Sequence, residues 1–122
     1  MSALEARLTT ARLGANTRLI SLIGEIDLWR VPQLHEALEE SVEEKTAKVI
    51  VDLKATEFID SSALAALALA WKRLRAQGGE LVLVCDDGRV RRVFEISGLD
   101  TVFRFEPSVQ EALAPAVAQE AA

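Results

Sequence analysis

The sequence predicts one α/β domain, built on a mixed β-sheet of four to five strands with about four helices packed on it. Two β-branched runs, 48–53 and 80–84, lack polar alternation, as do strands that a sheet buries on both faces. The segment between them is alanine-rich and has helical spacing, so the three together predict a strand–helix–strand unit with parallel strands. A length of 122 residues suits a single domain, which we expect to occupy 1–122.

The first part of the chain predicts a hairpin followed by a helix. Residues 6–13 and 18–23 are short apolar runs on either side of Gly14-Ala15-Asn16, and glycine and asparagine tolerate the positive φ angles of a tight turn. Pro32 suits the first turn of a helix. Helical spacing then selects the core-facing positions Leu34, Ala37, Leu38, Ser41 and Val42.

The second half of the chain predicts a long helix, a shorter helix, a strand and a last helix. The long helix ends at Gly78-Gly79, because glycine takes the left-handed cap conformation easily. Residues 89–97 predict the next helix, 101–105 a short strand, and Pro107-Ser108 the start of the final helix. We expect disorder from about residue 118. The final helix is expected to pack through Val109, Ala112 and Leu113.

The composition excludes several classes of function. The net charge of −5 argues against a nucleic-acid partner, since phosphate contacts need a concentrated basic surface. Cys85 is the only cysteine and His35 the only histidine, so we expect neither a disulfide, nor a metal site, nor thiol catalysis. Asp52 and Asp60 each follow an apolar run, but the acidic Mg²⁺ cluster of a phosphoaccepting receiver domain is missing. We expect no cofactor and no enzymatic activity.

The chain carries no signal for export or membrane insertion. Its first residues include early charges without an apolar core, unlike a signal peptide. The longest uncharged stretch, 61–71, is shorter than the roughly 18 residues that a membrane span requires. We therefore expect a cytoplasmic protein without direct membrane insertion.

The segment Phe58-Ile59-Asp60-Ser61-Ser62-Ala63-Leu64 places an acid and two hydroxyls at the start of the long helix. Aspartate and serine favour helix starts because their oxygens accept hydrogen bonds from N–H groups that lack partners inside the helix, so simple capping is one interpretation. A serine here is also a sensible phosphorylation site, since a helix N-terminus favours an added anion. Phosphate would bring about −1.5 to −2 charges into any contact surface at this place.

The long helix is predicted to have a core side and a contact side. Its core stripe is Leu64, Leu67, Trp71 and Leu74. At about 100° per residue, the roughly opposite side carries Ser62, Ala66, Leu69 and Arg73. Small residues on that side would let a partner protein approach closely. The alternative is that Leu69 packs beneath a neighbouring helix.

Three stretches together match one protein family. They are Gly24-Glu25-Ile26-Asp27, the run 49–53 with its continuation to Phe58-Ile59-Asp60-Ser61-Ser62, and 78–81 with 93–99. On these stretches the sequence resembles the STAS domains of bacterial anti-sigma factor antagonists, over nearly the whole chain. The resemblance implies a single STAS domain.

The resemblance also implies a phosphorylation site and a binding surface. In that family the anti-sigma factor is an ATP-dependent serine kinase that phosphorylates the first serine after the aspartate. Ser61 holds that place, and Ser62 is the second candidate. Asp27 and Asp60 are implied to help form the surface that the kinase recognises.

Two residues depart from the family pattern. Ala63 stands where the family usually has glycine, and the added methyl bears on how closely a kinase can approach. Trp29 stands where a small residue is common. Tryptophan is enriched at interface hot spots, so Trp29 is interpreted either as an anchor for a partner or as a lid over the core.

The function implied is partner switching by a protein that catalyses nothing itself. The unmodified chain would bind an anti-sigma factor serine kinase and so release a sigma factor, and phosphorylation of Ser61 would reverse the exchange. The chain would act as a monomer or weak dimer. An alternative is a STAS subunit of an ABC-type lipid transporter complex, which needs no phosphorylation, and a stressosome-type scaffold is a third possibility.

Overall fold

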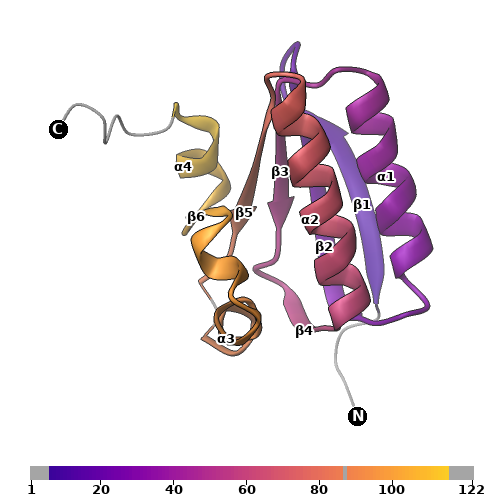
Figure 1. The fold of residues 1–122 in the computed structure, drawn as a ribbon, viewed down its shortest axis with the longest axis vertical. Helices are drawn as coiled ribbons and strands as arrows, with labels where there is room; N and C mark the ends of the chain where they lie inside the picture. The colour runs from indigo at the N-terminus through magenta and orange to yellow at the C-terminus, as the bar shows by residue number, and fades with distance from the viewer. Residues whose placement is uncertain (1–5, 87, 116–122) are drawn as a thin grey trace, which may run out of the picture.

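The structure is a computed structural model that describes residues 6–86 and 88–115. These residues contain six strands, four α-helices and one 3₁₀ turn (Figure 1). The strands are β1 (Arg7–Arg12), β2 (Thr17–Ile26), β3 (Lys48–Asp52), β4 (Thr56–Ile59), β5 (Glu80–Val84) and β6 (Arg104–Glu106). The helices are α1 (Val31–Glu43), α2 (Ser61–Ala76), α3 (Gly88–Ser97) and α4 (Val109–Leu113), with the turn η1 at Leu99–Thr101.

The strands form one mixed sheet in the order β1-β2-β3-β5-β6, in which only β1 is antiparallel to its neighbour. β2 is long enough to pair twice, first with β3 and then, at its end, with β4, where Ile26 lies opposite Ile59. The register shifts between Gly24 and Glu25, and Gly24 has a φ of 87° that other residues rarely adopt. This bulge brings the start of α2 to the end of β2.

Helices cover both faces of the sheet. α1 and α2 lie side by side over one face, as Figure 1 shows, and the larger hydrophobic core lies between them and the strands. α4 closes the other face, where Ala112 packs against Ile50, Val82 and Val84. α3 lies at the end of the sheet next to β4, held by Phe94, whose ring meets Phe105 edge to face at 5.3 Å.

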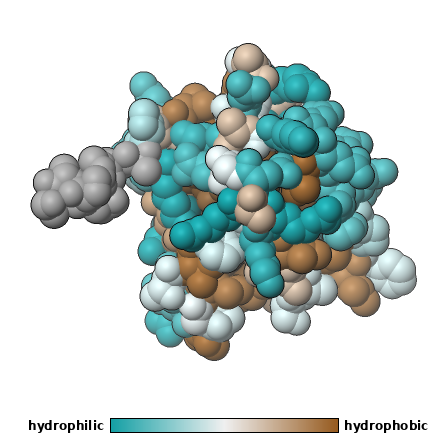
Figure 2. All heavy atoms as spheres, turned by 45° about the horizontal axis from the view of Figure 1, so that its top comes forward, coloured by the Kyte–Doolittle hydropathy of each residue, from teal (hydrophilic) through white to brown (hydrophobic). Residues whose placement is uncertain are grey.

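Hydrophilic residues predominate around the centre of the surface shown in Figure 2, and hydrophobic patches gather toward its lower side. Among the described residues, six large hydrophobic side chains are exposed: Leu28, Trp29, Phe58, Leu69, Ile96 and Leu113. Scattered exposed hydrophobic residues are ordinary, whereas several at one place point to a contact surface.

Most of the predicted elements are confirmed. The hairpin, the helix at Pro32, the parallel strands 48–53 and 80–84 and the long helix between them are all present. The mixed sheet and four α-helices agree with the predicted fold class. The buried positions of α1 are those that helical spacing selects: Leu34, Ala37, Leu38, Ser41 and Val42.

Three details differ from the sequence-based expectation. The strand β4 was not predicted, because its four residues are too few for a clear pattern. β6 begins at Arg104 and not at Thr101, since Leu99–Thr101 continues from α3 as a 3₁₀ turn. Leu113 does not pack in the core; it is 43% exposed at the end of α4, whereas Ala112 is buried against the sheet and Val109 packs against the same cluster, as expected. The expected disorder from residue 118 lies outside the described residues.

Candidate functional site

Two aspartates meet at the carboxyl ends of β2 and β4. Asp27 directly follows Ile26, and Asp60 directly follows Ile59, its partner in the parallel register. The N–H of Asp60 also donates to the carbonyl oxygen of Ile26 at 3.2 Å. The sheet register therefore places Asp27 beside the start of α2, where sequence spacing alone leaves them 33 residues apart.

Asp60 is the N-cap of α2. Its backbone is extended, with φ −97° and ψ 176°, and its Oδ1 accepts hydrogen bonds from the backbone N–H groups of Ser62 at 3.0 Å and Ala63 at 3.1 Å. The hydroxyl of Ser62 donates to the same oxygen at 2.7 Å. Asp60 therefore caps α2, and the same carboxylate oxygen also holds the Ser62 side chain.

Ser61 differs from Ser62 in both exposure and bonding. It is the first residue of α2 and is exposed, whereas Ser62 is half-buried. Within the described residues, the Ser61 hydroxyl has no hydrogen-bond partner, so it is free to meet another molecule. Ala63, at the departure from the family pattern, is completely buried, so its methyl points into the core and away from any approaching partner.

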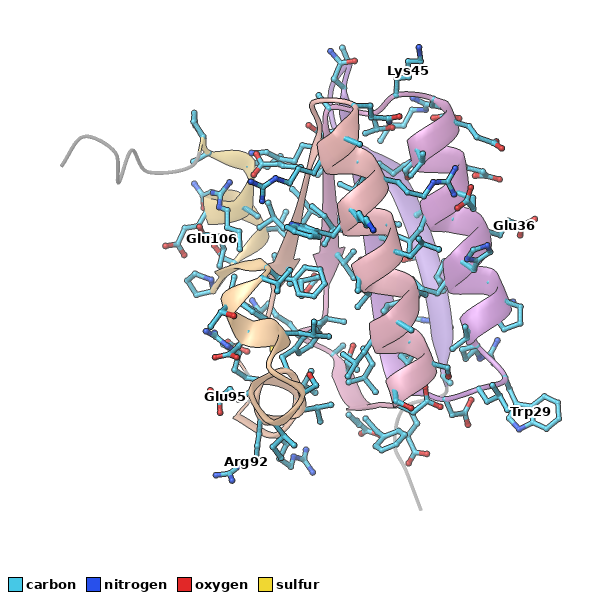
Figure 3. All side chains as sticks on the ribbon, in the orientation of Figure 1. Trp29, Glu36, Lys45, Arg92, Glu95 and Glu106 are labelled. Atoms are coloured by element: carbon cyan, nitrogen blue, oxygen red, sulfur yellow. The ribbon has the colours of Figure 1, made fainter. Side chains whose placement is uncertain are left out.

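The loop between β2 and α1 is folded tightly around Asp27. The carboxylate of Asp27 accepts from the backbone N–H of Trp29 at 3.0 Å, and its carbonyl oxygen accepts from the N–H of Arg30 at 2.9 Å. This turn leaves Trp29 85% exposed, pointing away from the ribbon in Figure 3. The interpretation of Trp29 as a lid over the core is therefore wrong, because the turn directs the side chain into solvent.

The contact side predicted for α2 is partly occupied by α1. Arg73 is bound to Glu39 of α1, and Ala66 is half-buried against the core. Leu69 stays 46% exposed, so it does not pack beneath a neighbouring helix. The four residues thus do not all lie opposite the core. Helical spacing predicts which side of α2 faces the sheet, but it does not predict which side a second helix such as α1 covers.

Phe58 belongs to this end of the molecule although sequence reasoning did not select it. It is 48% exposed on β4, opposite Glu25 of β2. The available signal was the alternation of a strand: when Ile59 is buried, its neighbour Phe58 points the other way.

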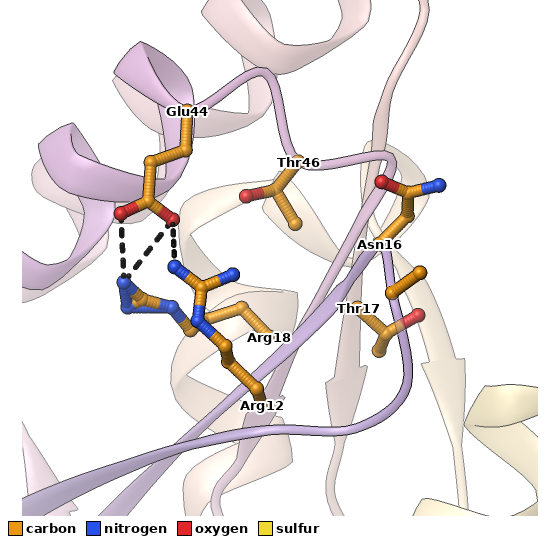
Figure 4. A pocket seen from close by; sticks show the side chains of 7 residues that line it. Arg12, Asn16, Thr17, Arg18, Glu44 and Thr46 are labelled. Carbon is orange, nitrogen blue, oxygen red and sulfur yellow. Dashed lines mark hydrogen bonds and ion pairs between the residues drawn. The ribbon is translucent and has the colours of Figure 1, made fainter.

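A separate polar cavity lies at the other end of the sheet, near the β1–β2 turn (Figure 4). Its volume is about 30 Å³, room for a water molecule. Arg18, whose side chain is 9% exposed, reaches Glu44 at 3.4 Å, and Arg12 reaches the same carboxylate at 2.9 Å. Arg18 also reaches the carboxylate of Glu40 at 3.5 Å, so two guanidinium groups face two carboxylates and the cavity belongs to a structural ion-pair cluster.

Two further features are absent from the described residues. None of their helices is both long and apolar enough to cross a bilayer. In the same part of the chain, no three acidic, histidine or cysteine side chains gather in a way that could hold a metal ion.

Comparisons with known proteins agree on one family. Residues 10–112 match the model of the STAS domain. An anti-sigma-B factor antagonist of Listeria monocytogenes is 34% identical over 87 residues, which cover 71% of this chain and 76% of the relative. The anti-sigma-F factor antagonist RsfB of Mycobacterium tuberculosis is 31% identical over 113 residues, covering 93% and 92%.

A solved structure leads to the same family. The crystal structure of an anti-sigma factor antagonist from Mycobacterium paratuberculosis superposes with a TM-score of 0.80 at 28% identity, covering 89% of this chain and 92% of that one. The family model spans most of the chain, and both sequence relatives exceed 30% identity over more than two thirds of it. The chain therefore belongs to the STAS domain family.

Proposed function

We propose that this chain is an anti-sigma factor antagonist whose binding to an anti-sigma factor serine kinase is switched off by phosphorylation of Ser61. The observation that carries the proposal is the exposed, unpartnered Ser61 hydroxyl at the N-terminus of α2, beside the carboxylates of Asp60 and Asp27. The relatives named as anti-sigma factor antagonists support the same class of function.

The phosphorylated serine is Ser61 and not Ser62, because their hydroxyls differ in availability. A kinase must align the acceptor oxygen with the γ-phosphate of ATP, which requires a hydroxyl that can leave the protein surface. Ser62 would have to give up its 2.7 Å hydrogen bond to Asp60 and expose a half-buried side chain. Ser61 needs neither change.

Phosphate at Ser61 acts through unbalanced negative charge. The added group carries about −1.5 to −2 charges at pH 7. Within the described residues, neither Asp27 nor Asp60 forms an ion pair with a lysine or arginine. The phosphate therefore adds to carboxylate charge that no ion pair in the described residues balances, so it remains hydrated and opposes burial in an interface.

The binding surface extends from Ser61 along α2 and across to the end of β2. The partner contacts the carboxylates of Asp27 and Asp60 and covers the exposed part of Leu69, and full burial of a leucine contributes roughly 1.5–3 kcal/mol. The remaining members of this surface are Ser62, Ala66 and Arg73.

The switch must change affinity by several kcal/mol. Moving occupancy from 99:1 to 1:99 takes about 5.5 kcal/mol of differential binding. Charge repulsion, together with the free-energy cost of removing water from the phosphate at a buried contact, is of that order for close charge pairs. The chain itself catalyses no reaction in this scheme, acts in the cytoplasm as a monomer or weak dimer, and releases a sigma factor by occupying its inhibitor.

The test is phosphorylation by a defined kinase. The purified chain is incubated with ATP and each anti-sigma factor of the source genome, and the site is mapped by mass spectrometry. We expect one phosphate on Ser61, none in Ser61→Ala, and the phosphate still on Ser61 in Ser62→Ala. Phosphate confined to Ser62, or no binding by any anti-sigma factor, would contradict the proposal; capture by a permease–ATPase complex would favour the transporter alternative.

A further inference from the structure

Three exposed hydrophobic side chains lie on two segments at the end of the sheet where α2 begins, the β2–α1 loop and β4. Leu28 is 65% and Trp29 85% exposed in the loop that follows β2, and Phe58 is 48% exposed on β4. The pairing of Ile26 with Ile59 brings this loop and β4 to the same edge of the sheet. Half of the six exposed large hydrophobic residues in the described ranges therefore lie at one edge, next to the start of α2.

Hydrogen bonds brace the loop that presents Leu28 and Trp29. The N–H of Trp29 and the N–H of Arg30 both bond to Asp27, and the guanidinium of Arg30 bonds to Gln33 at 3.2 Å. These bonds leave little backbone freedom to lose on binding. A preordered aromatic side chain is an efficient anchor, because little conformational entropy is lost when a partner buries it.

We infer that Leu28 and Trp29 form an apolar anchor, inserted into a pocket of the anti-sigma factor, whose contact is separate from the phosphorylation switch at Ser61. The inference rests on the proposed function and assigns recognition and switching to different residues. Trp29 lies on the β2–α1 loop and Ser61 on α2, so the anchor and the phosphate are carried by different elements.

The charges around the anchor identify the kind of partner. Glu25, Asp27 and Asp60 lie on the segments that flank the hydrophobic side chains, and these three carboxylates outnumber Arg30, the cation that follows Trp29. Two copies of this chain would bring the same carboxylates together, and an anionic membrane surface would also be repelled. A protein pocket that is apolar inside and basic at its rim fits both features, so the partner's recognition pocket has that chemistry.

The size of the effect follows from the behaviour of interface tryptophans. Removing a buried anchor tryptophan costs about 2 kcal/mol or more, which corresponds to about a 30-fold loss of affinity. We expect this loss for Trp29→Ala and a smaller one for Leu28→Ala. Since Ser61 is untouched, the phosphate should still go to Ser61 at saturating antagonist concentration.

The experiment compares Trp29→Ala and Leu28→Ala with Leu113→Ala, which removes another exposed hydrophobic side chain, 43% exposed, from α4. Affinity for the anti-sigma factor that phosphorylates Ser61 is measured by calorimetry, and KM and the modified residue by kinase assay. Trp29→Ala should raise Kd and KM about 30-fold, with phosphate still on Ser61, while Leu113→Ala matches the native chain.

Several results would overturn the anchor. If Kd is unchanged in Trp29→Ala while the native chain is phosphorylated normally, the proposed anchor is wrong and the proposed switch at Ser61 still stands. An equal loss in Leu113→Ala shows a nonspecific hydrophobic effect. Native-chain dimerisation in sedimentation, or binding to phosphatidylcholine or phosphatidylglycerol vesicles, that Trp29→Ala abolishes would assign the patch to another occupant. If no anti-sigma factor binds or phosphorylates the native chain, the proposed function itself fails.

Discussion

The hydroxyl of Ser62 donates a hydrogen bond to Oδ1 of Asp60 at 2.7 Å, and the same oxygen caps the backbone of α2. The neighbouring Ser61 is exposed and, within the described residues, unbonded through its side chain. A single carboxylate thus gives two adjacent serines different properties. One serine is tied into the helix cap, and the other is available to a kinase.

Substitutions at Ser61 should separate binding from modification. Ser61→Ala is expected to bind the anti-sigma factor as the native chain does and to resist phosphorylation, because only the free hydroxyl is lost. Ser61→Asp should fold normally but bind at least tenfold more weakly, about 1.4 kcal/mol, since it adds one negative charge beside Asp60. Calorimetry measures both affinities, with Ser97→Ala, an exposed serine of α3, as the control, and equal affinity of the two Ser61 variants would contradict the mechanism.

Substitutions at Asp60 should separate its capping role from its charge. Asp60→Ala removes the acceptor for two backbone N–H groups and should lower the free energy of unfolding by about 0.5–2 kcal/mol. Asp60→Asn keeps a capping oxygen and should cost less, while removing the negative charge from the site. Urea unfolding gives the stabilities, and a native-like stability for Asp60→Ala would show that the cap contributes nothing.

Helical spacing predicts which way a helix faces the sheet, and α1 is the clearest case. Its buried side chains, from Leu34 to Val42, recur at intervals that only one face of a helix can satisfy. The same reasoning identified Leu67 and Leu74 on α2, which are both buried. The prediction works because the buried face of each helix depends only on the sequence of that helix and on the side where the sheet lies.

The same spacing cannot predict which elements become neighbours. Arg73 was expected to face outward, but Glu39, 34 positions away, binds it because α1 lies alongside α2. β4 forms because the end of β2 offers it an open edge, a condition absent from its four residues. The Asp60–Ser61 motif was predictable because capping is local, whereas the position of Asp27 beside it depends on the β2–β4 register.

Gly79 should tolerate no side chain. A Cβ at this position would lie 2.8 Å from the carbonyl oxygen of Thr46 and 3.3 Å from that of Ala47, and backbone atoms cannot move aside cheaply. We expect Gly79→Ala to lower the free energy of unfolding by about 1–3 kcal/mol. Gly88→Ala is the matched control, because a Cβ there meets nothing within 4 Å, and its urea midpoint should stay at or above the native value. Equal midpoints for both variants would contradict this reading of the close approach.

Lys48 fastens α4 to the sheet, and removing its ammonium should loosen that helix selectively. Its Nζ donates to the carbonyl oxygens of Ala112 at 2.8 Å, Leu113 at 3.1 Å and Ala114 at 3.0 Å, which have no partner inside so short a helix. Arg104 holds Ala114 as well. Burial opposes its charge, but the Glu106 and Glu80 carboxylates outweigh that effect, so the pKa of Arg104 is raised and this second clamp stays charged.

Lys48→Met should therefore weaken α4 without detaching it. Hydrogen bonds to a charged group contribute about 1.5–3 kcal/mol, so we expect the free energy of unfolding, measured with urea, to fall by an amount in that range. Hydrogen exchange should quicken in α4 while α1 and α2 keep their protection, because Lys48 contacts neither helix in the hydrogen bonds described above. Lys54→Met, on an exposed residue, is the control. Faster exchange throughout the chain would instead assign Lys48 a global role in the sheet.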